Sequence, residues 1–146
     1  SRFKLRLIGG VDHTVQRDLD ASGLGPYIER IGQVDHNEAL RHMQRARTLL
    51  LPVNDTPNVG GFLPAKVFEY LAVQRPILAV APLDADIVRV LGKGHRVVPR
   101  GDVAAIRSAV DALFSDAAVI STDISSYHRR SLTAQLAGVL GGLRHH

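Results

Sequence analysis

The chain has 146 residues, of which 45% are hydrophobic and 22% charged, a composition that indicates one globular domain and excludes a disordered protein. It contains no cysteine, which excludes a disulfide scaffold, a cysteine-based zinc finger and a thiol nucleophile. The net charge of +4 mildly favours anionic partners, but aromatic residues make up only 5% of the chain and offer few surfaces on which bases could stack. We therefore expect no nucleic-acid partner.

No apolar run approaches about 18 residues, so we expect no membrane-spanning helix. We also expect no signal peptide. We expect a cytoplasmic protein, and peripheral contact with the inner face of the membrane is left open. His145 and His146 resemble the remnant of a purification tag. The domain is therefore expected to cover residues 1–144.

The first third of the sequence predicts two strands, at residues 3–8 and 27–31, each followed by a helix. Asp12 is expected to cap a helix that runs to residue 22 and stops at Gly23. Asp35 or Asn37 is expected to start the second helix, which reaches residue 46.

The rest of the sequence predicts three strands and four helices. Residues 48–53 and 76–80 are apolar without alternation, which is typical of buried parallel strands, and residues 96–98 predict a short strand. A loop at 54–63 precedes a helix at 64–73, with Pro64 at the first position, where its missing N–H costs nothing. Further helices are predicted at 84–91, at 102–113 with Asp102 as the cap, and at 125–140.

Strands separated by single helices form parallel sheets with right-handed crossovers. The pattern predicts an α/β fold, a Rossmann-like doubly wound parallel sheet of about five strands with helices on both faces. In such sheets ligands bind beyond the carboxyl ends of the strands. The loops after Ile8, Ile31, Val53 and Val80 are therefore the places where a site is expected.

The segment from Asn54 to Ala72 is the most unusual in the sequence: a long polar loop leads through Gly60 and Gly61 into a helix. Glycines let backbone N–H groups approach a ligand closely. The start of a helix adds unpaired N–H groups and about half a positive charge. Together these features predict a phosphate-binding site.

The helix that follows the glycines is nearly all apolar and carries two charges, Lys66 and Glu69, on one face. Counted from Pro64, Glu69 lies about 7–8 Å along the helix axis. At that distance its carboxylate could accept hydrogen bonds from the two hydroxyls of a ribose, while phosphates bind one turn earlier. An ion pair between Lys66 and Glu69 is the structural alternative, and the residues alone leave both readings open.

Residues 60–76 resemble the signature of the group 1 (family 4) glycosyltransferases of the GT-B fold. The resemblance rests on the paired glycines, the run Pro-Ala-Lys-Val-Phe-Glu-Tyr-Leu-Ala at 64–72 and the Arg75-Pro76 pair. Residues 7–10, 31–40 and 129–140 are similar to other segments of that family.

The resemblance implies a retaining, hexosyltransferase-type enzyme that uses a nucleotide-sugar such as a UDP- or GDP-sugar, with no metal and no cofactor. It also implies that this chain is the donor-binding half, that an amino-terminal domain holds the acceptor, and that the chain alone is inactive. No residue of the chain is identified as catalytic. The donor-binding residues that the resemblance implies are Gly9, Gly10, Gly32, Val34, Asn54, Thr56, Gly60, Gly61, Phe62, Leu63, Lys66 and Glu69.

The chain departs from the family pattern at one position. The family often carries two glutamates eight residues apart, the first near the donor sugar and the second on the ribose. Glu69 matches the second, but Gly61 stands in place of the first. Asn54, Thr56 or Asn58 could supply the sugar contact, although ordinary turn chemistry explains these residues equally well.

Two other classes remain open, an NAD(P)-binding domain of an oxidoreductase and a non-enzymatic Rossmann-like binding domain. Against the first, residues 9–12 lack the Gly-x-Gly-x-x-Gly pattern, and Ile31-Gly32 stands where an acid should close the second strand. The histidines show no metal-ligand spacing and are interpreted as hydrogen-bonded or solvated side chains: His13, His36, His42, His95 and His128.

Overall fold

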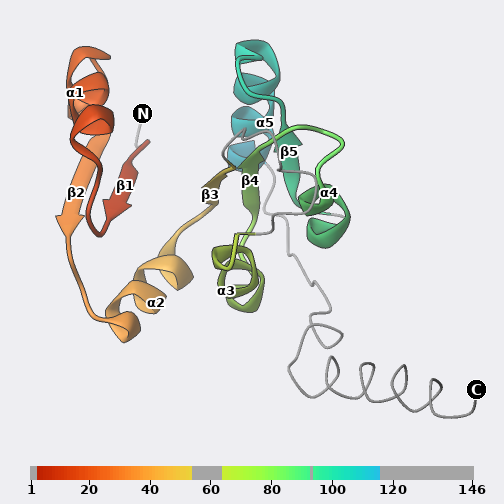
Figure 1. Ribbon diagram of the computed structural model, residues 1–146, viewed down its shortest axis with the longest axis horizontal. Coiled ribbons are helices and arrows are strands. Elements are labelled where there is room, and N and C mark those ends of the chain that lie inside the picture. Colours follow the sequence, from red (N-terminus) through yellow and green to blue (C-terminus); the bar gives the residue numbers. More distant parts are fainter. Residues whose placement is uncertain (1–2, 54–63, 93, 116–146) are drawn as a thin grey trace, which may run out of the picture. The chain divides into compact units, whose positions relative to one another are not determined.

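The computed structural model describes residues 3–53, 64–92 and 94–115. The chain divides into two compact units, Ser1–His42 and Met43–His146, and each is described by itself (Figure 1). Within the described residues, five strands pair in parallel, two in one sheet and three in another. The predicted α/β class and the parallel pairing are thus confirmed, with the strands distributed over two sheets.

The first unit contains two parallel strands, β1 (Leu5–Ile8) and β2 (Ile28–Gly32), joined by the helix α1 (His13–Ala21) and a short 3-10 turn, η1 (Gly25–Tyr27). Leu5 lies opposite Ile28 in the register. Tyr27 belongs to the 3-10 turn, so β2 begins one residue later than the sequence predicts.

Aspartates start both helices that were predicted here. Asp12 accepts a hydrogen bond from the Thr14 N–H at 2.8 Å, which confirms it as the cap of α1. Asp35 accepts one from the Glu38 N–H at 2.8 Å before α2 (His36–Arg45), so Asp35 and not Asn37 caps that helix. Each side chain supplies an acceptor to an amide that the first helical turn cannot satisfy.

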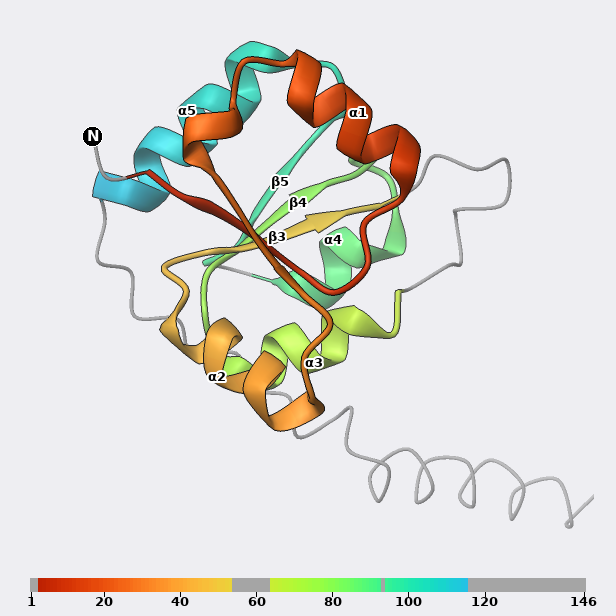
Figure 2. The same ribbon diagram turned by 90° about the vertical axis from the view of Figure 1, so that its left-hand side faces the viewer.

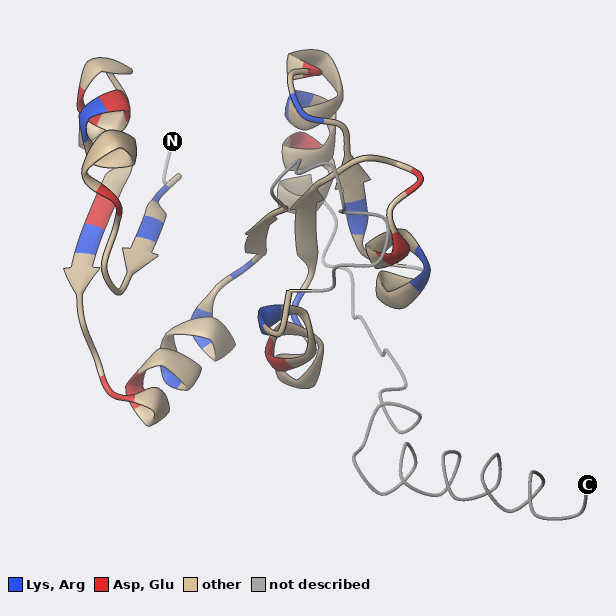
Figure 3. Cartoon of the chain, in the orientation of Figure 1, with Lys and Arg blue, Asp and Glu red and all other residues tan. Residues whose placement is uncertain are grey.

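Exposed ion pairs join the elements of the first unit, whose charged residues are coloured in Figure 3. Arg6 on β1 lies directly opposite Glu29 on β2, with 2.9 Å between Nη2 and Oε2. Arg30 on β2 reaches Asp20 on α1 at 2.7 Å. Such solvent-exposed pairs each contribute about 0–1 kcal/mol to stability, so they orient the elements more than they stabilise them.

The second unit contains a three-stranded sheet in the order β3-β4-β5, whose strands lie side by side in Figure 2. The strands are β3 (Leu49–Pro52), β4 (Ile77–Val80) and β5 (Arg96–Val98). The helices are α3 (Lys66–Val73), α4 (Asp86–Leu91) and α5 (Val103–Ser115). The Ala105 N–H donates to the Asp102 side chain at 2.9 Å, which confirms Asp102 as the cap of α5.

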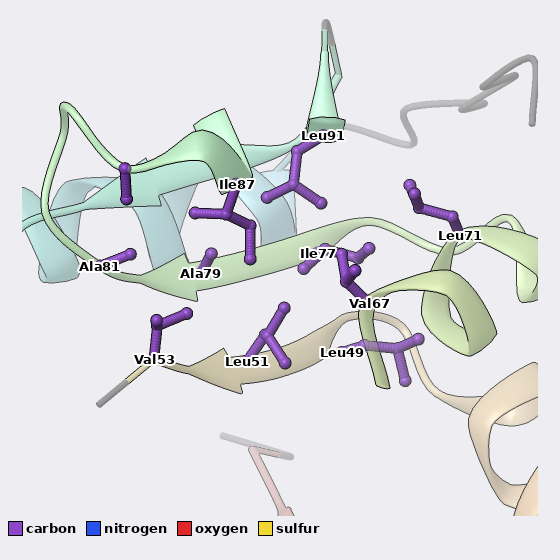
Figure 4. Packing of buried hydrophobic residues seen from close by; sticks show 11 residues of the cluster. Leu49, Leu51, Val53, Val67, Leu71, Ile77, Ala79, Ala81, Ile87 and Leu91 are labelled. Atoms are coloured by element: carbon purple, nitrogen blue, oxygen red, sulfur yellow. The ribbon is translucent and has the colours of Figure 1, made fainter. Parts of the chain in front are cut away.

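Helices pack on both faces of this sheet. One face packs against α3 and α4, and Figure 4 shows the apolar side chains that meet there. The opposite face packs against α5, where Leu78 and Val98 meet Ala109 and Leu113. The first cluster consists of Leu49, Leu51, Val53, Val67, Leu71, Ile77, Ala79, Ala81, Ala85, Ile87 and Leu91.

The two long strands of this unit differ in burial, although neither contains a charged residue (Figure 3). In β4, Ile77, Leu78 and Ala79 are all buried, because helices cover both faces of this central strand. In β3, burial alternates and Leu50 remains 41% exposed. The prediction of a fully buried strand is therefore correct for β4 and wrong for β3, which lies at the edge of its sheet.

The starts of two helices differ from the sequence prediction by two residues, and several other helix and strand ends differ by one or two. The helix α3 begins at Lys66 rather than Pro64, and α4 begins at Asp86 rather than at residue 84. The helix α3 ends at Val73, and its C-cap residue Gln74 adopts the left-handed conformation with φ 56 and ψ 42. The predicted loop at 54–63 and the predicted helix at 125–140 lie outside the described residues.

Candidate functional site

The helix α3 presents two different faces. Val67 and Leu71, one turn apart, are buried against the sheet, as Figure 4 shows, and are 0% and 1% exposed. Lys66 and Glu69 lie on the helix surface and are exposed. This arrangement follows from the helical period, which places residues three or four apart on one side. Both charged side chains therefore lie on the exposed part of the helix.

Lys66 and Glu69 form no ion pair with each other in the described part of the chain. The ion pair that the sequence offered as the alternative to ribose binding is thus not formed here. The carboxylate of Glu69 is open to solvent, while Val67 and Leu71 on the other side of α3 are buried. An exposed carboxylate of this kind can accept hydrogen bonds from the hydroxyl groups of a ligand.

The start of α3 is a 3-10 turn. The Val67 N–H donates to the Pro64 carbonyl at 2.9 Å, and the Phe68 N–H donates to the Ala65 carbonyl at 3.3 Å. These bonds use two of the four amides that a helix start leaves without helical acceptors. The amides of Ala65 and Lys66 are the two that this turn does not use. A phosphate at this end would therefore meet fewer backbone donors than the sequence suggests.

Because α3 starts later than predicted, Glu69 lies closer to the N-terminal end of the helix. Measured from Lys66, Glu69 lies about 4.5 Å along the axis, not 7–8 Å, and it falls within the first turn. This corrects the expected separation between a phosphate and the carboxylate. A negative charge in the first turn also interacts favourably with the helix dipole.

The negative charge of Glu69 affects the pKa of its neighbour Tyr70. Burial, and secondly the negative charge of Glu69, raise the pKa of the Tyr70 phenol above its ordinary value. Tyr70 packs beside the core under α3. Deprotonation of Tyr70 is therefore disfavoured mainly by its burial and secondly by the charge of Glu69.

Two predicted glycines of the first unit lie together at the carboxyl ends of β1 and β2. The Gly9 N–H donates to the Gly32 carbonyl at 2.6 Å. Gly9 has φ 98 and Gly32 has φ 71, conformations that strongly favour glycine. Their backbone geometry is therefore sufficient to explain both glycines.

Other predicted positions of the first unit are less constrained. A Cβ atom added at Gly10 would meet nothing within 4 Å, and Gly10 is not among the described residues with positive φ. Val34 follows β2 and is half-buried. The described residues therefore give no steric reason for a glycine at position 10, and its role in the close approach of a ligand stays a prediction.

Half of the predicted donor-binding positions lie outside the described residues. They are Asn54, Thr56, Gly60, Gly61, Phe62 and Leu63, together with the alternative Asn58. Their roles stay predictions. The loop after β4, which the sequence also singled out, is described, and both Leu83 and Asp84 are exposed there.

His95 is one residue whose place the sequence did not reveal. It is 9% exposed, and its Nδ1 accepts a hydrogen bond from the Ile77 N–H at 3.2 Å. Burial lowers the pKa of its imidazole below the ordinary value. The interpretation of His95 as a hydrogen-bonded histidine is therefore confirmed, but no local pattern in the sequence indicates its partner.

No group of three or more His, Asp or Glu side chains with the arrangement of a metal site occurs among the described residues. In the same part of the chain, no helix combines the length and the apolar character needed to cross a membrane.

A comparison with known proteins gives a family match that includes all of the described residues. A family model described as glycosyl transferases group 1 matches residues 1–116. No curated protein matches the chain. The family match favours glycosyl transfer over the two alternatives left open by the sequence, the NAD(P)-dependent oxidoreductase and the non-enzymatic binding domain.

Proposed function

The chain belongs to the group 1 glycosyltransferases, and we propose that it binds the nucleotide-sugar donor of a retaining, hexosyltransferase-type enzyme. The donor class is a nucleoside diphosphate sugar, such as a UDP- or GDP-sugar. The acceptor would be held by a separate amino-terminal domain of the GT-B fold. The 146 residues alone would therefore bind nucleotide without transferring sugar.

The position of Glu69 supports this proposal best. It is an exposed carboxylate in the first turn of α3, it is not paired with Lys66, and the helix beneath it is fixed by Val67 and Leu71. A carboxylate held on a rigid element can accept both hydroxyl hydrogen bonds of a ribose. We propose this role for Glu69, a positioning role and not that of an acid or base.

The start of α3 would bind the diphosphate. The amides of Ala65 and Lys66, which the 3-10 turn at the start of α3 does not use, the Lys66 ammonium and the positive end of the helix dipole all attract negative charge. Negative charge on the diphosphate increases as the bond to the sugar breaks. Donors that are already oriented toward this charge lower the barrier without reorganisation.

The test is a calorimetric titration of the chain with UDP, GDP, ADP and NAD, repeated with Glu69→Gln. We expect one nucleoside diphosphate to bind selectively and to bind Glu69→Gln about 10 to 100-fold more weakly, since hydrogen bonds to a charged group contribute about 1.5–3 kcal/mol. Glu38→Gln is the matched control, because Glu38 is also an acid in the first turn of its helix.

Three results would contradict the proposal. The first is a preference for NAD, which would point to an oxidoreductase domain. The second is equal weakening by Glu69→Gln and Glu38→Gln, which would indicate a general effect on helices. The third is unchanged affinity in Glu69→Gln, which would remove this residue from the donor site.

A further inference from the structure

The hydrogen bonds between β4 and β5 follow a regular series that ends at Ile77. The Ala81 N–H donates to the Val98 carbonyl at 3.0 Å. Donors toward one neighbour recur at every second residue of a parallel strand, so the amides of Ala79 and Ile77 also face β5. The carbonyl that would complete the series for Ile77 belongs to Gly94, four residues before Val98.

Gly94 does not continue the strand, because β5 begins at Arg96 and Gly94 has φ 94, which turns the chain. The His95 imidazole takes the place of the missing carbonyl: its Nδ1 accepts the Ile77 N–H at 3.2 Å. Ile77 is 0% exposed and His95 is 9% exposed. Water therefore cannot readily replace this acceptor, and a buried amide without a partner destabilises the paired state.

We propose that His95 makes the pairing at the start of β4 and β5 sensitive to pH. The neutral imidazole holds the two segments together through its bond to Ile77, and protonation of the imidazole by acid breaks this bond and lets the segments separate. The bond to Ile77 requires an Nδ1 without a proton, and hence the tautomer that carries its proton on Nε2. A proton added at Nδ1 would face the Ile77 N–H, so that two donors meet and the bond breaks.

The surroundings of His95 determine whether acid stabilises or destabilises the pairing of β4 with β5. Burial lowers the pKa of His95, and no charged group of the described residues is a cause of this shift. The charged residues on α4 and on the segments next to Ile77 and His95 are Arg75, Arg89 and Arg96, which are exposed, and Asp86, which pairs with Arg89 at 3.4 Å. Lys93 lies outside the described residues. Since the unfolded chain takes up the proton more readily, acid destabilises the closed state from about pH 6.5 downward.

Hydrogen exchange of the Ile77 amide, followed by NMR on the unaltered chain between pH 7.5 and 5, tests the proposal directly. Through the titration of His95, we expect the protection of this amide to fall by about tenfold per pH unit after correction for the intrinsic exchange rate. The imidazole nitrogen shifts should show an unprotonated Nδ1 at pH 7.5. Constant protection across this range, or a protonated Nδ1 at pH 7.5, would overturn the proposal.

Two variants complete the test. His95→Asn retains a side-chain acceptor that does not titrate, so the pH dependence at Ile77 should disappear. His13→Gln, at an exposed histidine on α1, should leave it unchanged. A pH dependence that persists in His95→Asn would assign the effect to another group. If His95→Asn fails to fold, the exchange and nitrogen measurements on the unaltered chain still decide the question.

Discussion

Replacing Gln74 by glycine should stabilise the second unit. Gln74 ends α3 with φ 56, and it is the only non-glycine residue of the described chain with a positive φ. For a residue with a Cβ atom this left-handed conformation costs about 1–2 kcal/mol. Glycine removes that cost but gives the unfolded chain more freedom, worth about 0.5–1 kcal/mol. Because the Gln74 side chain is exposed, little packing is lost, and the net gain should be about 0.5–1 kcal/mol.

Urea denaturation of the chain and of Gln74→Gly measures this difference, which corresponds to a rise in Tm of about 2–6 °C. The matched control is Gln44→Gly, at an exposed position in the last turn of α2, which should lower the free energy of unfolding by up to about 1 kcal/mol. Opposite signs for the two variants are expected. Equal losses of stability would show that the left-handed conformation of Gln74 is not strained, and would refute the reasoning.

The remaining predictions concern a helix end and a buried phenol. Arg47 donates to the carbonyls of Leu113 and Phe114 at 3.2 and 2.6 Å, so Arg47→Ala should lower the free energy of unfolding by about 1–3 kcal/mol in urea denaturation. Arg107→Ala, at an exposed site on the same helix, should change it by less than about 0.5 kcal/mol, and similar losses would contradict the assignment. The raised pKa of Tyr70 means that the folded chain keeps the proton longer than the unfolded chain, so stability falls as the pH rises above about 10. Tyr70→Phe should reduce this fall in Tm between pH 8 and 11, and an unchanged fall would show that another group causes it.

Features determined by residues close in sequence could be predicted. The caps Asp12, Asp35 and Asp102 each bind an amide two or three residues away, so a short stretch of sequence contains the whole interaction. The strand at 96–98 was predicted with its observed bounds. The outward position of Lys66 and Glu69 likewise follows from the helical period alone.

Features that depend on distant segments could not be predicted. Leu50 is exposed because β3 lies at the edge of its sheet, although its sequence is as apolar as that of β4. The partner of His95 lies 18 residues away and is reached only when β4 and β5 pair. The start of α3 was misplaced because proline suits both a first helical position and the 3-10 turn that precedes Lys66 here.

Glu69 has two effects that act in different states of the protein, and they can be separated. As an acid in the first helical turn, it stabilises α3 by about 0.3–1 kcal/mol whether or not a ligand is bound. As a ribose acceptor, it would add stability only when nucleotide is present, by an amount that grows with ligand concentration. Glu38→Gln removes an acid from the first turn of α2, so it should cause a loss of the first kind without any loss of nucleotide binding. The increase in Tm caused by nucleotide, compared between Glu69→Gln and Glu38→Gln, therefore isolates the binding role from the helical one.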